Sequence, residues 1–435
     1  MTRIALRRLL AAPLLVSAAA LGAVAWAVPA GAQSPGWATL GGLAFPSSDH
    51  ATIWQLAADP AQPADILAAT SRGVYRSSDG GQLWTATSIA RWTWTVAFSG
   101  SGSASYAGTE TGGVYRSTDA GASWSQDNGG LSNLDVRAVA IAPDAVVLGT
   151  NSGVYVGGTG IGWEPAGLKG TSISSLAVIA ASPLGVLAGS DSTTASVNLF
   201  SNLAVGSATS WQSVTGGDPQ GAPVFAIGAG PQAKGATSPP ILVGNLKGLY
   251  LSTNGGSTFQ EVNLSQGAVW SVNTIAFDPV NPDVVYVGGD NGGSTGGGLQ
   301  RSVNGGSSWQ VWQTGLPAAD VTGIWVEPTN PVTALASLWV AATRQPLTAK
   351  LIDTTAPGPV PLQAIGATSP IQISPPPAAS PTPSSTPTGG RGHGVSIAIP
   401  AWAPPVVAAI LVVALVGIFM WLRRRRSRLD AEAPP

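Results

Sequence analysis

Two aspartates in the same short phrase are the first candidates for acid–base chemistry. Asp79 lies in GVYRSSDGGQLW, which starts at Gly73, and Asp119 lies in GVYRSTDAGASW, which starts at Gly113. Paired carboxylates serve as acid and base in glycoside hydrolysis. Here, however, each carboxylate sits among glycines in a repeated turn, where an Asp side chain hydrogen-bonds to nearby backbone. We therefore interpret both as turn caps and predict no catalytic residue among them.

The phrase occurs twice more with Asn in place of Asp, as GLYLSTNGGSTF from Gly248 and GLQRSVNGGSSW from Gly298. Its glycines supply the positive φ of a hairpin turn, and its aromatic residue covers the hairpin. Phrases that start about every 40–50 residues indicate a propeller or a solenoid. The four copies consist of Ser77, Asp79, Gly81 and Trp84; Ser117, Asp119, Gly121 and Trp124; Ser252, Asn254, Gly256 and Phe259; and Ser302, Asn304, Gly306 and Trp309.

The clearest repeat, from Val269 to Trp312, contains four short strand patterns separated by Gly- and Asn-rich turns. Four antiparallel strands of this length make one propeller blade. Residues 321–353 supply three more strands, and Gly36–Gly42 resembles the outer strand that ends other blades, so we predict that it closes the ring. Six hairpins, near Gly73, Gly113, Gly153, Asn198, Gly248 and Gly298, together with this last blade predict an all-β, seven-bladed propeller. Six and eight blades are the alternatives.

The four phrases resemble the Asp-box (BNR) repeats of sialidases, sortilin-type receptors, xyloglucanase-like glycosidases and photosystem II assembly factors. The resemblance implies a propeller with Asp-box hairpins on one face and a ligand site on the opposite face. It is specific for the hairpin and does not fix a function.

An enzyme of these families would need further residues. The resemblance to sialidases implies an arginine cluster and a Tyr nucleophile with a Glu partner, but all six tyrosines occupy repeat-strand positions: Tyr75, Tyr106, Tyr115, Tyr155, Tyr250 and Tyr286. Xyloglucanase-like enzymes use paired Asp residues between two propellers, and this chain supplies one propeller. We expect no catalytic set, and a glycoside hydrolase of sialidase or xyloglucanase type is the alternative.

Composition excludes other classes of site. The absence of cysteine excludes disulfides, thiolate metal sites and a Cys nucleophile. Asp290 and Asn291 provide too few ligands for Ca²⁺, and His50 has no convincing triad partner. No phosphate loop or dinucleotide fingerprint occurs, so we expect neither metal nor cofactor. Between Gln33 and Ala398 there are 12 basic and 19 acidic residues, a balance unsuited to nucleic acid.

Candidate ligand-binding residues come from the face opposite the repeated turns. Trp92, Trp94 and Arg137 begin or precede first strands, as does Trp54, and the other candidates lie in loops between second and third strands: Arg72, Glu110, Lys247 and Arg344. Aromatic rings beside charged and amide groups can bind sugars or peptide segments. The alternatives are that Trp54 and Trp94 pack between blades and that the charges serve solubility.

The two ends of the chain have the composition of targeting and membrane-anchoring segments. Residues 1–32 are typical of a secretory signal peptide, with a permanent N-terminal anchor as the alternative. After the predicted propeller (33–354), residues 355–394 form a Pro/Ser/Thr-rich linker, residues 395–422 a single transmembrane segment, and residues 423–435 a basic tail. The arginines of the tail indicate that the C-terminus is cytoplasmic and the propeller extracytoplasmic. A wall-sorting signal is a competing idea, but no Leu-Pro-x-Thr-Gly occurs in the linker.

These features predict a monomeric, membrane-anchored propeller that binds an extracytoplasmic protein or carbohydrate without catalysis. An assembly factor for a membrane complex is a further alternative.

Overall fold

The computed structural model describes residues 36–40, 43, 51–102, 104–158, 162–181, 183–205, 210–217, 221–264, 271–290, 298–340 and 342–363. They all belong to the first of two compact units, Met1–Ser374; the second is Pro375–Pro435. The predicted signal peptide, transmembrane segment and basic tail lie outside the described residues. No helix in the described part is long and apolar enough to cross a membrane.

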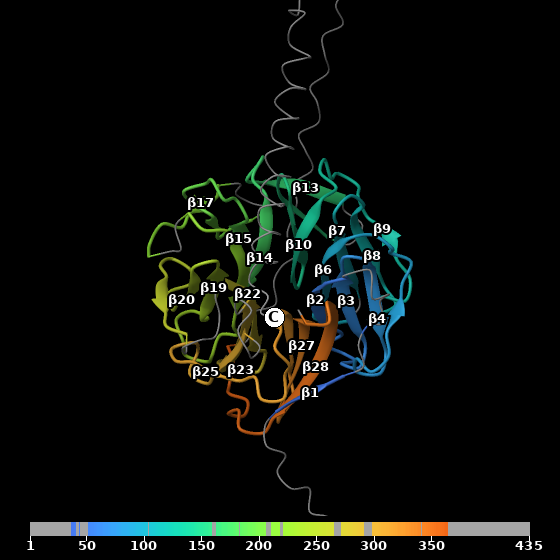
Figure 1. Ribbon diagram of the computed structural model, residues 1–435. Helices are drawn as coiled ribbons and strands as arrows, with labels where there is room; N and C mark the ends of the chain where they lie inside the picture. Colours follow the sequence, from blue (N-terminus) through green and yellow to red (C-terminus); the bar gives the residue numbers. More distant parts are fainter. Residues whose placement is uncertain are drawn as a thin grey trace, which may run out of the picture. The chain divides into compact units, whose positions relative to one another are not determined.

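Seven four-stranded antiparallel sheets are arranged around a common centre (Figure 1). Blade 1 is β2 (Ile53–Ala58), β3 (Ile66–Thr70), β4 (Gly73–Ser77) and β5 (Thr85–Ala86). Blade 2 is β6 (Thr93–Phe98), β7 (Ser105–Thr109), β8 (Gly113–Ser117) and β9 (Ser125–Gln126). Blade 3 is β10 (Val136–Ala142), β11 (Ala145–Thr150), β12 (Gly153–Gly158) and β13 (Gly162–Gly167). Blade 4 is β14 (Ile173–Ala181), β15 (Leu184–Ser190), β16 (Leu199–Asn202) and β17 (Gln212–Ser213).

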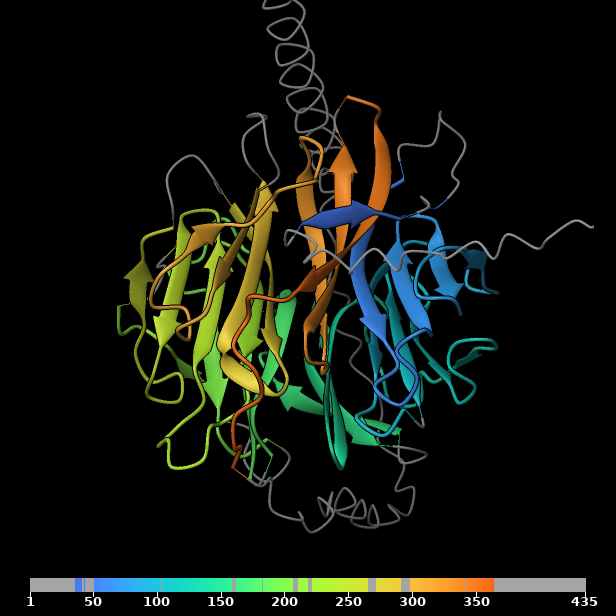
Figure 2. The same ribbon diagram turned by 90° about the horizontal axis from the view of Figure 1, so that it is seen from below.

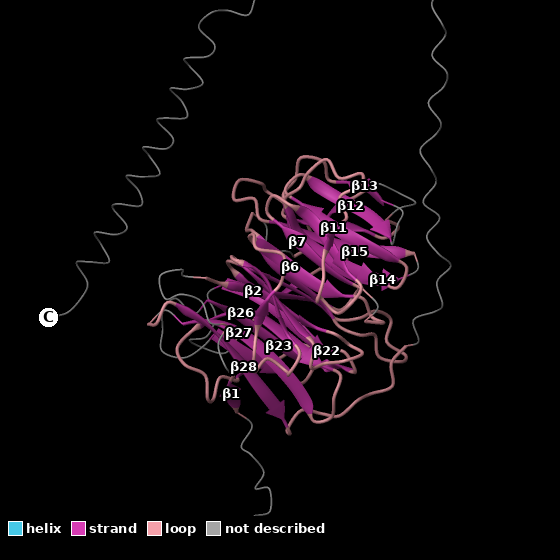
Figure 3. Cartoon of the chain, turned by 90° about the vertical axis from the view of Figure 1, so that its right-hand side faces the viewer, coloured by secondary structure: helices cyan, strands magenta, loops and turns pink. Residues whose placement is uncertain are grey.

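The ring continues with two more blades of the same order and a composite last blade. Blade 5 is β18 (Val224–Ala229), β19 (Ile241–Asn245), β20 (Gly248–Ser252) and β21 (Gln260–Val262). Blade 6 is β22 (Ser271–Asp278), β23 (Asn281–Asp290), β24 (Gly298–Ser302) and β25 (Gln310–Val311). Blade 7 is β26 (Asp320–Glu327), β27 (Val332–Val340), β28 (Gln345–Asp353) and the N-terminal β1 (Trp37–Thr39). The predicted all-β, seven-bladed propeller is therefore confirmed, and every described regular element is a strand (Figure 3).

The ring closes as the sequence predicts, because β1 adds to β28 in blade 7 (Figure 2). Trp37 pairs with Leu351, and Thr39 pairs with Ala349. The Trp37 ring is 4% exposed, and its Nε1 donates to the carbonyl of Trp312 in blade 6 at 2.8 Å. A strand from one end of the described chain is thus held by strands from the other.

Neighbouring blades approach closely at a glycine that recurs in the second strands. A Cβ at Gly149 in blade 3 would lie 2.7 Å from Ile173 of blade 4, and one at Gly244 in blade 5 would lie 2.5 Å from Val272 of blade 6. Larger residues would separate the blades or distort them. The first strands of successive blades contact one another around the whole ring, and β26 contacts β2.

The repeated phrases form one turn geometry, between the third and fourth strands of blades 1, 2, 5 and 6. In blade 2, Ser117 Oγ donates to Asp119 Oδ1 at 2.7 Å and accepts the Gly121 amide at 2.9 Å. Asp119 Oδ1 accepts the Ser123 amide at 2.8 Å. Asn254 and Asn304 accept through Oδ1 at the same place in blades 5 and 6, from the amides of Thr258 and Ser308.

The aromatic residue of each phrase joins its own turn to the preceding blade. Trp124 Nε1 donates to the Gly121 carbonyl at 2.9 Å, and its ring packs in a cluster with Leu67 of blade 1. Trp309 clusters in the same way with Leu242 of blade 5. These residues therefore take part in the turns, where the sequence places them, and also in contacts between blades, which the sequence does not predict.

Beyond β28 the described chain continues over two blades as residues 355–363. Asn281 Nδ2 of blade 6 donates to the Gly358 carbonyl at 2.7 Å, and the Val360 amide donates to the Val280 carbonyl at 3.1 Å. The amide of Lys234 in blade 5 donates to the Pro361 carbonyl at 2.8 Å. We call residues 355–363 the C-terminal strap. The sequence assigns them to the linker, whereas here they hydrogen-bond to the propeller.

Candidate functional site

All seven first strands carry a register shift near their beginning, so that one residue in each is left unpaired. In blade 1 the shift lies between Ile53 and Gln55, and in blade 2 between Thr93 and Thr95. A β-bulge of this kind re-aims a side chain, and bulges are over-represented next to functional sites. The seven unpaired residues are Trp54, Trp94, Arg137, Ser174, Phe225, Asn273 and Thr322.

These seven residues line a central cavity of about 210 Å³. Because strands alternate in direction, the first strands begin at the end of each blade where second strands turn into third strands. The repeated turns between third and fourth strands lie at the opposite end. We call the first end the bulge face and the second the turn face.

Three tryptophans cluster on the bulge face. The Trp54 ring centroid lies 5.6 Å from that of Trp92 and 5.7 Å from that of Trp94, and the Trp92 and Trp94 centroids lie 5.3 Å apart. All three side chains are half-buried. The Nε1 atoms of Trp54 and Trp92 are buried and have no hydrogen-bond partner within the part of the chain that the structure describes. The cluster thus combines contact between blades with aromatic surface at the cavity.

Arg137 is held beside the cluster by two carboxylates. Its Nε lies 3.0 Å from Asp135 Oδ2, and its Nη1 lies 2.6 Å from Asp191 Oδ2 in blade 4. The guanidinium also stacks 5.4 Å from the centre of the Trp94 ring, whose Nε1 donates to Asp135 Oδ1 at 3.0 Å. Blades 2, 3 and 4 are therefore joined by one charged network, which orients both the arginine and Trp94.

The structure brings together three of the seven ligand-binding candidates and places a fourth beside them. Trp92, Trp94 and Arg137 belong to the cluster, and the Glu110 amide donates to the Trp92 carbonyl at 3.0 Å. The remaining candidates are exposed in second-to-third strand turns of blades 1, 5 and 7: Arg72, Lys247 and Arg344.

Sequence reasoning missed the acids that hold Arg137. Asp135 precedes the first strand of blade 3, and Asp191 lies after the second strand of blade 4, far along the chain. An alignment of the seven first strands on their buried starting residues would have placed Trp54, Trp94 and Arg137 at one position, but it would not have shown that a bulge leaves this position unpaired. The pairing of Arg137 with Asp191 depends on how blades 3 and 4 pack, which such an alignment does not contain.

The charged groups at the centre of the bulge face are largely paired with one another. The carboxylates of Asp135 and Asp191 both pair with the Arg137 guanidinium. The central cavity is otherwise lined by aromatic, hydroxyl, amide and aliphatic side chains. Burial raises the pKa of Asp278, but this residue ends β22 at the turn face. Among the described residues, no group of three or more His, Cys, Asp or Glu side chains could hold a metal ion.

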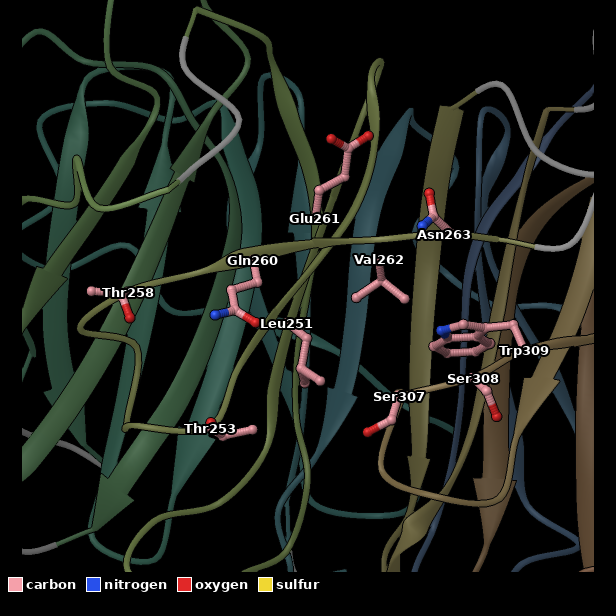
Figure 4. A pocket seen from close by; sticks show the side chains of 10 residues that line it. All are labelled: Leu251, Thr253, Thr258, Gln260, Glu261, Val262, Asn263, Ser307, Ser308 and Trp309. Atoms are coloured by element: carbon pink, nitrogen blue, oxygen red, sulfur yellow. The ribbon is translucent and has the colours of Figure 1, made fainter.

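A second hollow, of about 470 Å³, lies between the outer strands of blades 5 and 6 (Figure 4). Gln260 and Val262 of β21 form one wall, and Trp309 with Ser307 and Ser308 forms the other. Glu261 is the one ionisable residue in its lining, and its carboxylate points away from Trp309 in Figure 4. This hollow therefore offers no acid–base pair.

The chain is therefore a seven-bladed β-propeller with a cavity at its centre. No family model and no curated protein match the chain. Among solved structures, it is similar to YCF48 from Cyanidioschyzon merolae, with a TM-score of 0.51 and 17% identity over 74% of this chain and 100% of that one. A structure of YCF48 bound to D1 peptide gives a TM-score of 0.52 and 16% identity over 73% of this chain and 96% of that one.

The GH74 xyloglucanase from Xanthomonas campestris is also similar, with a TM-score of 0.50 and 15% identity over 72% of this chain and 55% of that one. This chain thus spans about half of the xyloglucanase. At these identities the comparisons establish the propeller fold.

Proposed function

We propose that this chain is a non-catalytic, membrane-anchored binding protein whose bulge face holds a segment of an extracytoplasmic protein. The observation that carries the proposal is the cluster of Trp54, Trp92 and Trp94 beside Arg137 at the centre of that face. Trp and Arg are enriched among residues that dominate binding energy, and such residues gather near the centre of an interface.

The surroundings of the cluster support a protein ligand. The turns of the bulge face carry exposed charges of both signs: Arg72, Lys247 and Arg344 are basic, and Glu110 is acidic. A polar rim around an aromatic centre is the usual anatomy of a protein interface. Two structural neighbours are YCF48 and YCF48 bound to D1 peptide, so a propeller of this kind that holds a peptide has a precedent.

The anchor and the Asp-box assignment belong to the same proposal. The uncharged run from Pro405 to Leu422 and the arginines after it support a single span with a cytoplasmic C-terminus. The hydrogen bonds of the four repeated turns support their assignment to the Asp-box class. An assembly role for a membrane complex would be one use of such a protein.

Site-specific photo-crosslinking tests the proposal. A photoreactive residue at Arg72 or Lys247 should capture an extracytoplasmic protein, whereas one at Leu83, which is 73% exposed on the turn face, should not. Once the partner is identified, Trp94→Ala and Arg137→Ala should each weaken binding by about 1–3 kcal/mol. Leu83→Ala is the matched control. Loss of binding on altering the turn face near Gly80 or Gly305, with the two cluster variants unchanged, would overturn the assignment of the face.

A further inference from the structure

A cleft of about 570 Å³ opens on the bulge face between blades 3 and 4. One wall is the connection from β13 to β14, and the other is the long turn from β15 to β16. This volume falls within the range of about 300–1,000 Å³ that is usual for small-molecule pockets. Its lining includes Arg137, Ser190, Asp191, Ser192, Thr194 and Phe200.

The cleft and the central cavity adjoin each other at Arg137, which lines both. The lining of the central cavity also contains Trp54 and Trp94, and the lining of the cleft also contains Asp191. The guanidinium at this junction is paired with Asp135 and Asp191. A ligand that passes from the tryptophans into the cleft therefore meets a charge that is already compensated.

The cleft is lined by neutral polar groups. Apart from the paired Arg137 and Asp191, its side chains carry no charge, and most of the polar ones are hydroxyls. A hydroxyl both donates and accepts a hydrogen bond. An extended peptide backbone presents N–H and C=O groups in alternation, so a hydroxyl-rich wall can satisfy both. The half-buried ring of Phe200 adds apolar surface.

The outer wall of the cleft is held in place before any ligand binds. The Ser192 amide donates to Ser190 Oγ at 3.2 Å, and the Ala195 amide donates to Ser192 Oγ at 3.1 Å. Asn198, which is 1% exposed, donates from Nδ2 to the Ser192 carbonyl at 3.0 Å. A wall fixed by its own hydrogen bonds lowers the ordering cost of binding.

We infer that the cavity and the cleft form one track for an extended, uncharged peptide segment. An apolar side chain such as Leu, Pro or Phe packs against Trp54 and Trp94, and the residues beside it lie in the cleft. The three indole planes are inclined to one another by 27°, 44° and 54°. Because the rings pack against one another, part of each face is already covered, which favours a compact side chain over a sugar ring that needs one open flat face. This inference rests on the proposed function and specifies its ligand.

Selection from random peptides tests the track. The full-length chain in detergent micelles is panned against phage that display random dodecapeptides, and enriched peptides are synthesised for affinity measurements. We expect one aromatic, Leu or Pro residue next to several consecutive uncharged residues. Because no net charge is engaged, the affinity should change less than about threefold between roughly 50 and 500 mM salt.

A cleft-filling substitution and a matched control locate the bound peptide. Thr194→Trp places a ring in the cleft and should lower the affinity at least about tenfold. Thr111→Trp, in the equivalent exposed turn of blade 2, should leave it within about twofold. Thermal melts of both variants check that the fold is intact.

The outcomes separate the inference from the proposed function. Enriched peptides that depend on Trp54 but tolerate Thr194→Trp would overturn the track and leave the proposed binding face standing. Enrichment of charged peptides with steep salt dependence would overturn the neutral ligand. Binding of oligosaccharides in place of peptides, sensitive to Thr194→Trp, would overturn the peptide class and the proposed protein ligand together.

Discussion

At the scale of single residues, the repeated turns show a carboxylate whose hydrogen bonds all lie within its own turn. Asp119 accepts hydrogen bonds from the hydroxyl and amide of Ser123 and from the Ser117 hydroxyl, and these bonds lower its pKa to about 2. A charge satisfied in this way has no proton to give at neutral pH. In blades 5 and 6, Asn254 and Asn304 make the same amide contacts without the charge.

Substitution of Asp119 should therefore act on stability. Asp119→Ala should cost roughly 1 kcal/mol, as loss of a turn cap does, whereas Asp119→Asn should cost less because Oδ1 is retained. The folded-state pKa is depressed, so the contribution of the charge is present above pH about 4 and is lost as pH falls through about 2. Denaturant titrations at several pH values measure both effects. If Asp119→Ala removed ligand binding while the unfolding curve stayed fixed, the carboxylate would be chemical.

A buried hydrogen-bond network at the end of blade 7 should contribute more to stability than a single turn cap does. Asp353 is 0% exposed and accepts hydrogen bonds from Tyr286, Arg301 and Thr355. Burial works against its charge, but these hydrogen bonds together hold its pKa below the usual value. Burial and the neighbouring Asp353 charge raise the pKa of Tyr286, which therefore stays a neutral donor.

Asp353→Asn should destabilise the propeller by about 3–5 kcal/mol, because it leaves the buried Arg301 charge without its partner. Tyr286→Phe removes one neutral donor and should cost less, about 1–3 kcal/mol. Since the Asp353 pKa is depressed, its contribution is present above the ordinary pKa of an aspartate and is lost as pH falls below it. Calorimetry of both variants at neutral pH decides the ranking. Equal, small losses would mean that the network is hydrated and weak.

At the scale of elements, β1 and the C-terminal strap hold the ring from its two ends. Trp37→Ala should cost about 3–5 kcal/mol, as truncation of a buried aromatic residue does. Deletion of residues 36–42 should cost at least as much, because it also leaves β28 as an open edge. Thermal unfolding measures both. A deletion variant that melts within a degree or two of the parent would show that β1 adds nothing to closure.

The strap should stabilise the propeller separately from β1. A chain that ends at Gln363 keeps the hydrogen bonds of the strap to blades 5 and 6, and a chain that ends at Thr354 loses them. We expect the shorter chain to fold and to melt lower, with faster hydrogen exchange at the Lys234 amide, which loses the Pro361 carbonyl as its acceptor. Coincident melting curves would place residues 355–363 with the linker, as their Pro-rich composition suggests.

The sequence predicted the elements better than the site. The hairpins at Gly73 and Gly113, and the closing strand at Trp37, follow from local patterns that repeat along the chain. The bulges at Trp54 and Trp94 leave no local signal, because a register shift depends on the partner strand. The contact of Arg137 with Asp191 depends on the packing of two blades. The composition of residues 355–363 predicts a linker, and it contains no sign of the hydrogen bonds that this segment makes to blades 5 and 6.

At the scale of the whole molecule, the acidic propeller and the basic C-terminal tail belong to different compartments in the proposed arrangement. The run from Pro405 to Leu422 would span about 27 Å as a helix at 1.5 Å per residue, close to the hydrocarbon thickness of a bilayer. Its neighbours Arg423 to Arg426 would stay on the cytoplasmic side. The tether should therefore be separable from binding.

A chain that ends at Gly394 should be released from the membrane and keep its affinity for ligand. The double substitution Val412→Arg with Leu415→Arg should have the same effect, since each central arginine costs about 2.5–3.5 kcal/mol of insertion. Ala378→Arg, in the linker, is the matched control and should stay anchored. Carbonate extraction and protease protection of intact cells measure location. Full-length protein that is extracted by carbonate, or a propeller that is protected from external protease, would contradict the single-span topology. A released chain that no longer binds its ligand would show that the membrane itself contributes to the site.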